Sequence, residues 1–333
     1  MGLGATSWQH VATLEAMRVL VTGATGFVGR HLVHLLQARR HTVIATCHAP
    51  NKTGTLPGVA PEPCDVRDFS AVRYLMKRAR PDRIFHLAAF SSVRSSFEDL
   101  RTVYEVNFGG TLNLLQAARE AAPESRVLIV GSGQSYGTVK RGELPIRETQ
   151  AFAPESPYAA SKAAADASAH QFFRSFGLQV IRARSFNHTG PGQSAEFVCS
   201  DFARQVAAIT LRGHAGRIEV GDLSRERDFS DVRDIVRAYY LLMERGRPGE
   251  AYNVGSGRST PAAEILRRLS SFSPYPVRKV VRRERFRRAD ARRLYADVRK
   301  LRRQTGWAAR YSLDRTLRDL YEFWLERLSS GPA

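Results

Sequence analysis

Three glycines spaced three residues apart constrain this chain more than any other feature. Gly23, Gly26 and Gly29 follow the β-branched run Arg18–Val21, and apolar residues then recur at helical spacing up to Leu36. A strand, a glycine-rich turn and a helix in this order let the main chain approach a pyrophosphate, because unpaired N–H groups and the helix dipole favour an anion there. The stretch therefore predicts the first half of a βαβ unit and a dinucleotide site.

The composition limits the remaining possibilities. A chain of 333 residues with 43% hydrophobic content is long enough for one large domain or two closely associated ones. No apolar run approaches the length of a membrane span, and residues 1–16 contain no Lys or Arg, unlike a signal peptide. We expect these residues to be a disordered tail ahead of Met17. Three unpatterned cysteines are typical of a reducing cytoplasm and predict no metal site.

The net charge of +19 is unusually positive, and much of the excess lies late in the chain. Residues 278–303 contain thirteen Lys or Arg against three Asp or Glu. Such a segment can bind nucleic acid, form a solvated face or attract an anionic substrate and cofactor. Only Phe286 and Tyr295 are aromatic within it, which disfavours a surface for stacking bases.

The end of the predicted second strand, at residues 42–46, bears on the choice of dinucleotide. Enzymes that prefer NAD place an acidic residue there for the ribose hydroxyls, and this chain has Cys47 and His48 instead. The missing acid removes a charge that would repel a 2′-phosphate. The sequence therefore favours NADPH slightly without excluding NADH.

A serine, a tyrosine and a lysine occur in an order that suits acid–base chemistry. Ser132 follows a predicted strand at residues 126–130, and Tyr158 and Lys162 lie four apart on a helix that begins near Ser156. A phenol is a poor acid–base group at neutral pH, but an ammonium about 4–6 Å away lowers its pKa by roughly 1–3 units. We therefore expect Lys162 to lower the pKa of Tyr158.

Alternating strands and helices predict an α/β fold, a Rossmann-type doubly wound parallel sheet with a smaller C-terminal substrate-binding lobe. Residues 17–185 form the dinucleotide-binding domain, which residues from about 229 to 255 complete. Residues 186–228 and 256–333 form the lobe. Asn107 begins a predicted long helix, and the loop Ser185–Gln193 leads out of the sheet.

These motifs together resemble the extended short-chain dehydrogenase/reductases, the NAD-dependent epimerase/dehydratase family, from Met17 to the end. The family acts mostly on nucleotide sugars. The segments NHTGPGQ at 187–193, GDLSRERDFSDVRD at 221–234 and YNVGSGR at 252–258 resemble most its GDP-6-deoxy-4-keto-D-mannose reductases. The resemblance implies NAD(P)H-dependent reduction of the 4-keto group of GDP-4-keto-6-deoxy-D-mannose to GDP-D-rhamnose.

The resemblance also assigns site residues. It implies that Ser132, Tyr158 and Lys162 are catalytic. It implies that the cofactor is bound by Gly23, Gly26, Phe27, Val28, Gly29, Asp65, Val66, Leu87, Ala88, Ala89, Asn107, Tyr158, Lys162 and His188. It implies that the nucleotide sugar is bound by Ser91, Ser132, Asn187, Arg227, Arg287 and Asp290. An arginine fork suits a diphosphate geometrically.

Several alternatives stay open. A GDP-mannose 4,6-dehydratase or another nucleotide-sugar 4-epimerase or dehydratase would share most of these motifs. The resembling dehydratases place a Glu two residues after the active-site hydroxyl, and this chain has Gln134 there. A dinucleotide-binding sensor or a basic nucleic-acid-binding protein are the non-enzyme alternatives.

The resemblance further implies a homodimer, formed by the helices near residues 98–119 and 158–176. Leu112, Leu115, Phe172 and Phe173 give these helices their apolar content. The same residues could equally face the sheet.

Overall fold

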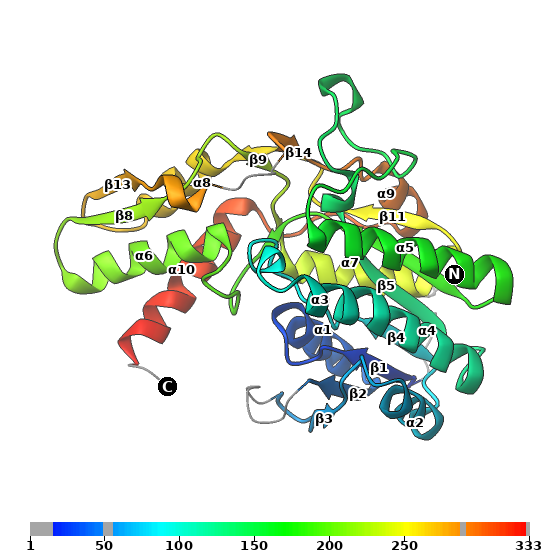
Figure 1. The fold of residues 1–333 in the computed structure, drawn as a ribbon. Coiled ribbons are helices and arrows are strands. Elements are labelled where there is room, and N and C mark those ends of the chain that lie inside the picture. Colours follow the sequence, from blue (N-terminus) through cyan, green and yellow to red (C-terminus); the bar gives the residue numbers. More distant parts are fainter. Residues whose placement is uncertain (1–15, 49–55, 287–290, 331–333) are drawn as a thin grey trace, which may run out of the picture.

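A parallel sheet of seven strands forms the larger part of the molecule (Figure 1). The computed structural model describes residues 16–48, 56–286 and 291–330. In spatial order the strands are β3 (Glu62–Pro63), β2 (Thr42–Cys47), β1 (Arg18–Thr22), β4 (Arg83–His86), β5 (Arg126–Ser132), β6 (Val180–Ser185) and β11 (Ala251–Val254). All six neighbouring pairs are parallel. The predicted doubly wound α/β fold is confirmed.

Helices cover both faces of this sheet. On one face lie α1 (Phe27–Ala38), α7 (Val232–Arg245) and α9 (Arg299–Thr305). On the other lie α2 (Phe69–Ala79), α4 (Gly110–Ala121) and α5 (Pro157–Phe176), with α3 (Leu100–Tyr104) beside α5. Apolar side chains of both layers bury against the sheet, and that burial is the main force holding such layers together. The sheet order reverses beside β1, and ligands of such sheets bind at the carboxyl ends of the strands there.

A second lobe lies to one side of the sheet (Figure 1). It contains α6 (Val198–Arg212), β8 (Gly216–Val220), α8 (Ala262–Ser270), β13 (Val277–Val281) and α10 (Leu313–Ser329). Its own core includes Phe202, Val206 and Trp324, and the Trp324 indole donates a hydrogen bond to Ser200 Oγ at 2.9 Å. Short pairings join the lobe to the sheet domain: β7 (His188–Thr189) with β10 (Ser230–Asp231), and β9 (Glu226–Arg227) with β12 (Thr260–Pro261) and β14 (Arg293–Leu294).

The helix ends follow the local signals closely, with one exception. Ser156 caps α5, Pro157 takes its first position, and Gly177 ends it with φ +71°. Asp68 caps α2 through the Ala71 N–H. The exception is Asn107, which does not begin a helix but lies in a π-helical turn, η3 (Glu105–Gly109), between α3 and α4. The extra residue of such a turn is placed by tertiary contacts of the side chain, which local periodicity does not reveal.

Part of the basic excess stabilises helix ends. Arg18 donates to the carbonyl of Ala79 at the end of α2, Arg126 donates to main-chain carbonyls at the end of α7, and Arg245 donates to the carbonyl of Thr305 at the end of α9. Cations there complement the negative end of the helix dipole and satisfy carbonyls that the helix leaves unpaired. In the late basic segment, Arg282, Arg285, Arg293, Arg299 and Lys300 form ion pairs with carboxylates.

Among the helices of the described residues, none combines the length and the apolar character that crossing a membrane requires.

Candidate active site

One large cleft runs from the carboxyl ends of the strands to the second lobe. Its volume is about 1320 Å³. A site for one small molecule usually measures about 300–1,000 Å³. The cleft therefore has room for two ligands, one against the sheet and one against the lobe.

The sheet side of the cleft is formed by the glycine turn and the end of β4, which we call the glycine wall (residues 23–29 and 87–89). Gly23 has φ +68°, and a Cβ on it would lie 2.8 Å from the Ala88 nitrogen. A Cβ on Gly29 would lie 2.3 Å from the Gly23 carbonyl oxygen. These close approaches require glycine, because any side chain would meet main chain. Ten predicted cofactor residues line the cleft here: Gly23, Gly26, Phe27, Val28, Gly29, Asp65, Val66, Leu87, Ala88 and Ala89.

The start of α1 fits a pyrophosphate. Gly26 is its N-cap and offers no side-chain hydrogen bond, and the first turn contains no acidic residue. The N–H groups of that turn are thus available to an anion, which the helix dipole also favours. A dinucleotide held here would supply the hydride for a reduction.

The cleft also contains a carboxylate held by an arginine. Arg67 Nη2 donates to Asp65 Oδ2 at 2.6 Å, and His48 Nδ1 lies 3.6 Å from the same oxygen. The Arg67 hydrogen bonds lower the pKa of Asp65, so the carboxyl group is ionised at neutral pH. All three residues line the cleft, at the position expected for an adenosine.

Tyr158, Ser132 and Lys162 meet at the middle of the cleft. Tyr158 and Lys162 occupy successive turns of α5, and Ser132 ends β5. Ser132 Oγ accepts a hydrogen bond from the Gln134 N–H at 3.1 Å, so its own hydrogen is available to Tyr158, to which it is hydrogen-bonded. Lys162 is buried, and its Nζ donates to the Val130 carbonyl at 2.9 Å.

The electrostatics of this group differ from the sequence-based expectation. Burial raises the pKa of Tyr158 above its ordinary value, and the hydrogen bond from Ser132 only partly opposes that effect. Burial also lowers the pKa of Lys162 to about 8. The expected lowering of the Tyr158 pKa by Lys162 is therefore wrong for this structure. Desolvation disfavours the charged form of both groups, and the lysine is engaged by a main-chain carbonyl instead.

Asn107 holds the helix that carries these residues. Its side-chain nitrogen donates to Ser161 Oγ at 2.9 Å and to the Phe90 carbonyl, and its oxygen accepts from the Phe90 N–H. Ser161 in turn donates to the Tyr158 carbonyl at 2.8 Å. Asn107 is buried and joins the loop after β4 to the start of α5.

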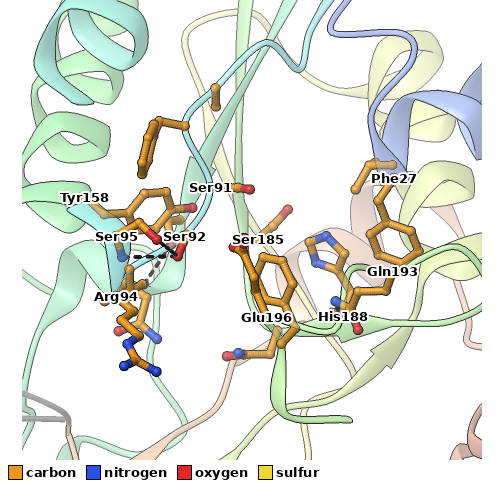
Figure 2. Close-up of a pocket in the computed structure, with 18 of the residues that line it drawn as sticks. Phe27, Ser91, Ser92, Arg94, Ser95, Tyr158, Ser185, His188, Gln193 and Glu196 are labelled. Atoms are coloured by element: carbon orange, nitrogen blue, oxygen red, sulfur yellow. Dashed lines mark hydrogen bonds between the residues drawn. The ribbon is translucent and has the colours of Figure 1, made fainter. Parts of the chain in front are cut away.

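Aromatic rings flank the sheet side of the cleft opposite Tyr158 (Figure 2). Phe27 and His188 stack with centroids 6.2 Å apart, and His188 Nδ1 is hydrogen-bonded to the Phe186 carbonyl at 2.9 Å. Burial lowers the pKa of His188, so its imidazole is neutral. Figure 2 shows Ser92, Arg94 and Ser95 on the side of Tyr158.

Four of the six predicted substrate residues line the cleft: Ser91, Ser132, Asn187 and Arg227. Arg227 is buried in β9, with its Nη1 donating to the Glu226 carbonyl at 2.7 Å. Arg287 and Asp290 lie outside the described residues.

The lobe side of the cleft contains residues that the sequence did not single out. Asp201, Glu219, Asp222 and Arg285 form what we call the charged wall. Ser185 and Tyr239 also line the cleft, with their hydroxyl groups 2.5 Å apart. These residues come from elements far apart in the sequence, and the only local signal was the high charge of the late basic segment. Within the described ranges, no group of three or more His, Cys, Asp or Glu is placed to hold a metal ion.

The fold and the Ser132–Tyr158–Lys162 group define an extended short-chain dehydrogenase/reductase. Residues 20–320 match the family model described as GDP-mannose 4,6 dehydratase, and the chain belongs to that family.

Comparisons with individual proteins give similar results. The GDP-6-deoxy-D-mannose reductase of Pseudomonas aeruginosa is 36% identical over 311 residues, which cover 93% of this chain and 98% of the relative. The structure of RMD from Pseudomonas aeruginosa complexed with NADPH is 35% identical with a TM-score of 0.81, covering 94% of this chain and 100% of that one. The dTDP-glucose 4,6-dehydratase of Xanthomonas campestris is 30% identical, covering 92% of each chain.

Proposed function

We propose that the protein reduces the 4-keto group of GDP-4-keto-6-deoxy-D-mannose to give GDP-D-rhamnose, with hydride from a nicotinamide dinucleotide. The observation that carries this proposal is the pairing of a protonated Tyr158 with Gln134 beside Ser132. Tyr158 can donate a proton, and Gln134 cannot act as a base. The likeness to a GDP-6-deoxy-D-mannose reductase supports the same choice.

Different residues of the cleft have different roles in a ketone reduction. Hydride adds to carbon 4 of the sugar, and the Tyr158 hydroxyl gives its proton to the carbon 4 oxygen. Ser132 donates a hydrogen bond to that oxygen, where negative charge develops. The raised pKa of Tyr158 keeps the phenol protonated at neutral pH, which is the form that a reduction consumes. The phenolate that remains takes its proton back from solvent.

A 4,6-dehydratase requires more than this group offers. Such an enzyme oxidises carbon 4, removes a proton from carbon 5 and expels water from carbon 6. Gln134 occupies the position where the resembling dehydratases have a Glu, and an amide has no basic form at neutral pH. The described carboxylates that line the cleft come from other segments: Asp65, Glu196, Asp201, Glu219, Asp222 and Glu284.

The proposal is tested by supplying purified protein with two substrates. GDP-4-keto-6-deoxymannose with NADPH should give stoichiometric oxidation of the cofactor and GDP-D-rhamnose, identified by NMR. GDP-mannose with NAD⁺ or NADP⁺ should stay unchanged. Formation of a keto sugar from GDP-mannose would show a dehydratase instead.

We also propose a preference for NADPH over NADH. Strand β2 itself ends without an acidic residue: Cys47 and His48 line the cleft there, and the nearby Asp65 carboxylate is paired with Arg67. Arg30 lies on α1 with its Nε donating to the Thr25 carbonyl, and Thr25 lines the cleft too. A strand end that has no acidic residue of its own, with basic side chains nearby, suits a 2′-phosphate. The ratio of kcat/KM for the two cofactors measures this preference, and a ratio in favour of NADH would contradict it.

We also propose a homodimer, but with a surface formed by other residues than the sequence indicated. Leu115 and Phe172 are buried in the core against the sheet, so they do not form a docking surface. Exposed apolar side chains just before α3, on α3 and at the end of α5 support one instead: Phe97, Leu100, Tyr104 and Phe176 are 52%, 54%, 40% and 44% exposed. Sedimentation at micromolar concentration should show a dimer, and a monomer would refute it.

A cytoplasmic location is proposed from the cysteines. Cys47, Cys64 and Cys199 are buried and unpaired, and burial raises the pKa of the Cys64 thiol to about 11. Free thiols are typical of a reducing compartment.

A further inference from the structure

The charged wall lies where the nucleotide of the substrate should end. The dinucleotide site occupies the glycine wall, and Tyr158 stands at the middle of the cleft, so a sugar at Tyr158 must extend its nucleotide toward the lobe. There β8 and α6 supply Glu219 and Asp201, and the turn η6 (Arg283–Arg285) supplies Arg285. Figure 1 shows β8, β13 and α6 on the side of the molecule away from β1, β2 and β3.

The Glu219 carboxylate is held in place and still exposed. Arg282 Nε donates to Glu219 Oε1 at 2.9 Å, and Arg285 Nη2 donates to Glu219 Oε2 at 3.2 Å. The side chain nevertheless keeps 44% of its surface exposed. Arg282 lowers the pKa of Glu219, so the group is a carboxylate that only accepts hydrogen bonds.

The main chain that carries Glu219 is also fixed. The Gln205 side chain accepts from the Glu219 N–H at 2.8 Å and donates to the Glu219 carbonyl at 3.1 Å. Gln205 also donates to Asp201 Oδ2, and Arg285 donates to the same oxygen at 2.8 Å. A carboxylate oriented in advance loses little entropy when it binds a ligand.

We propose that Glu219 is the residue that selects guanine as the base of the nucleotide sugar, a role that rests on the proposed function. The two oxygens accept hydrogen bonds from the ring N1–H and the exocyclic amino group of guanine. Uracil and thymine present a carbonyl where guanine presents the amino group, so the carboxylate would face an acceptor. Charge-assisted bonds to a fixed acceptor, together with this repulsion, give selectivity.

The other carboxylates of the lobe are less suited to this role. Asp201 is only 15% exposed, against 44% for Glu219, and it accepts from three side chains, Arg204, Gln205 and Arg285, where Glu219 accepts from two. Asp222 is bound within its own turn by Ser224 and Arg225. Glu196 and Glu284 are exposed, and within the described residues no ion pair fixes their carboxylates. Glu284 is therefore the informative control.

The test is a set of binding measurements on the whole enzyme by isothermal titration, with GDP, inosine diphosphate, xanthosine diphosphate and UDP. Inosine lacks the amino group, and xanthosine replaces it with a carbonyl. A hydrogen bond to a charged group contributes about 1.5–3 kcal/mol, so wild-type protein should bind GDP at least about tenfold more tightly than inosine diphosphate. UDP and xanthosine diphosphate should bind more weakly still.

Two variants identify the residue. Glu219→Gln should bring the GDP and inosine diphosphate affinities to within about twofold of each other, since the charged acceptor is gone. The new amide can donate to the xanthine carbonyl, so xanthosine diphosphate should gain affinity relative to GDP. Glu284→Gln should keep the wild-type order. NADPH binding and the thermal midpoint of each variant establish that it is folded.

Each contrary result has a separate meaning. Equal wild-type affinities for GDP and inosine diphosphate, or a lost preference in Glu284→Gln with Glu219→Gln unchanged, would overturn the role of Glu219 and leave the reductase proposal standing. Tighter binding of UDP than of GDP would overturn the choice of guanine. Binding of no nucleoside diphosphate would overturn the proposed function itself.

Discussion

The glycine wall of the cleft is made largely of main chain, whereas the charged wall is made of side chains that reach across elements. At the glycine wall, main-chain groups approach so closely that Gly23 and Gly29 have no room for a Cβ. At the charged wall, Arg285 joins Asp201 of α6 to Glu219 of β8. The shape of the glycine wall requires positions that have no side chain. The charged wall requires ionised side chains that bind one another. Mutations should therefore act on them in opposite ways.

The largest effect is expected where the two walls meet. Tyr158→Phe removes only the transferable proton, so kcat should fall by about 100- to 10,000-fold. The affinity for the dinucleotide should stay near normal, because the ring remains. Stopped-flow turnover and fluorescence titration with NADPH measure the two quantities. Substantial remaining turnover would rule out Tyr158 as the acid.

Adding one methyl group should damage the glycine wall. Gly29→Ala places a Cβ 2.3 Å from the Gly23 carbonyl oxygen, and overpacking of this kind costs about 1–3 kcal/mol. We expect that loss in urea unfolding, together with weaker NADPH binding. Gly142→Ala is the matched control, since a Cβ there would meet nothing within 4 Å. Equal stability of the two variants would contradict the steric account.

The lowered pKa of Lys162 predicts that kcat/KM depends on pH. Its pKa in the folded protein is lowered to about 8, so the charged form is present below that pH and lost above it. If the ammonium is required, kcat/KM should be flat up to pH 8 and fall about tenfold per unit beyond it. The unfolded chain binds more protons here than the folded one, so the contribution of Lys162 to stability rises between pH 8 and its ordinary pKa.

These opposite trends separate titration from denaturation. The pH–rate profile and a series of unfolding curves over the same range provide the check. A flat profile up to pH 9.5 would show that the charge of Lys162 is not needed.

The smallest effect is expected from removing a charge at the lobe. Arg282 is 46% exposed and pairs with the similarly exposed Glu219. Exposed ion pairs contribute about 0–1 kcal/mol, so Arg282→Gln should change the free energy of unfolding by less than about 1 kcal/mol. A loss comparable to that of Gly29→Ala would mean that the charged wall holds the fold together as well as orienting a side chain.

The sequence was informative where the structure is local. The glycine turn, the Ser156 cap and the Tyr158–Lys162 spacing each depend on residues within one helical turn or one tight loop. Asn107 was recognised but misplaced, since its π-helical turn is fixed by bonds to Phe90 and Ser161. The direction of the Tyr158 pKa was missed because burial depends on the whole fold.

The charged wall also shows that local sequence does not reveal contacts between distant segments. Arg285 and Glu219 are 66 residues apart, and nothing in either local sequence indicates that they meet. The sequence shows that the late segment has an excess of basic residues. It does not show which carboxylates pair with its arginines, because these lie on other elements. Long-range pairs of this kind follow from the packing of the lobe.

The central proposal is that a dinucleotide held by the glycine wall gives its hydride to carbon 4 of a sugar whose nucleotide lies on the charged wall. The most direct test uses NADPH deuterated at the transferring position of the nicotinamide, with GDP-4-keto-6-deoxymannose as substrate. NMR of the product sugar should show deuterium at carbon 4 and none at carbon 6. Deuterium at carbon 6, the position that receives hydride in a 4,6-dehydration, or no transfer to the sugar, would contradict the account.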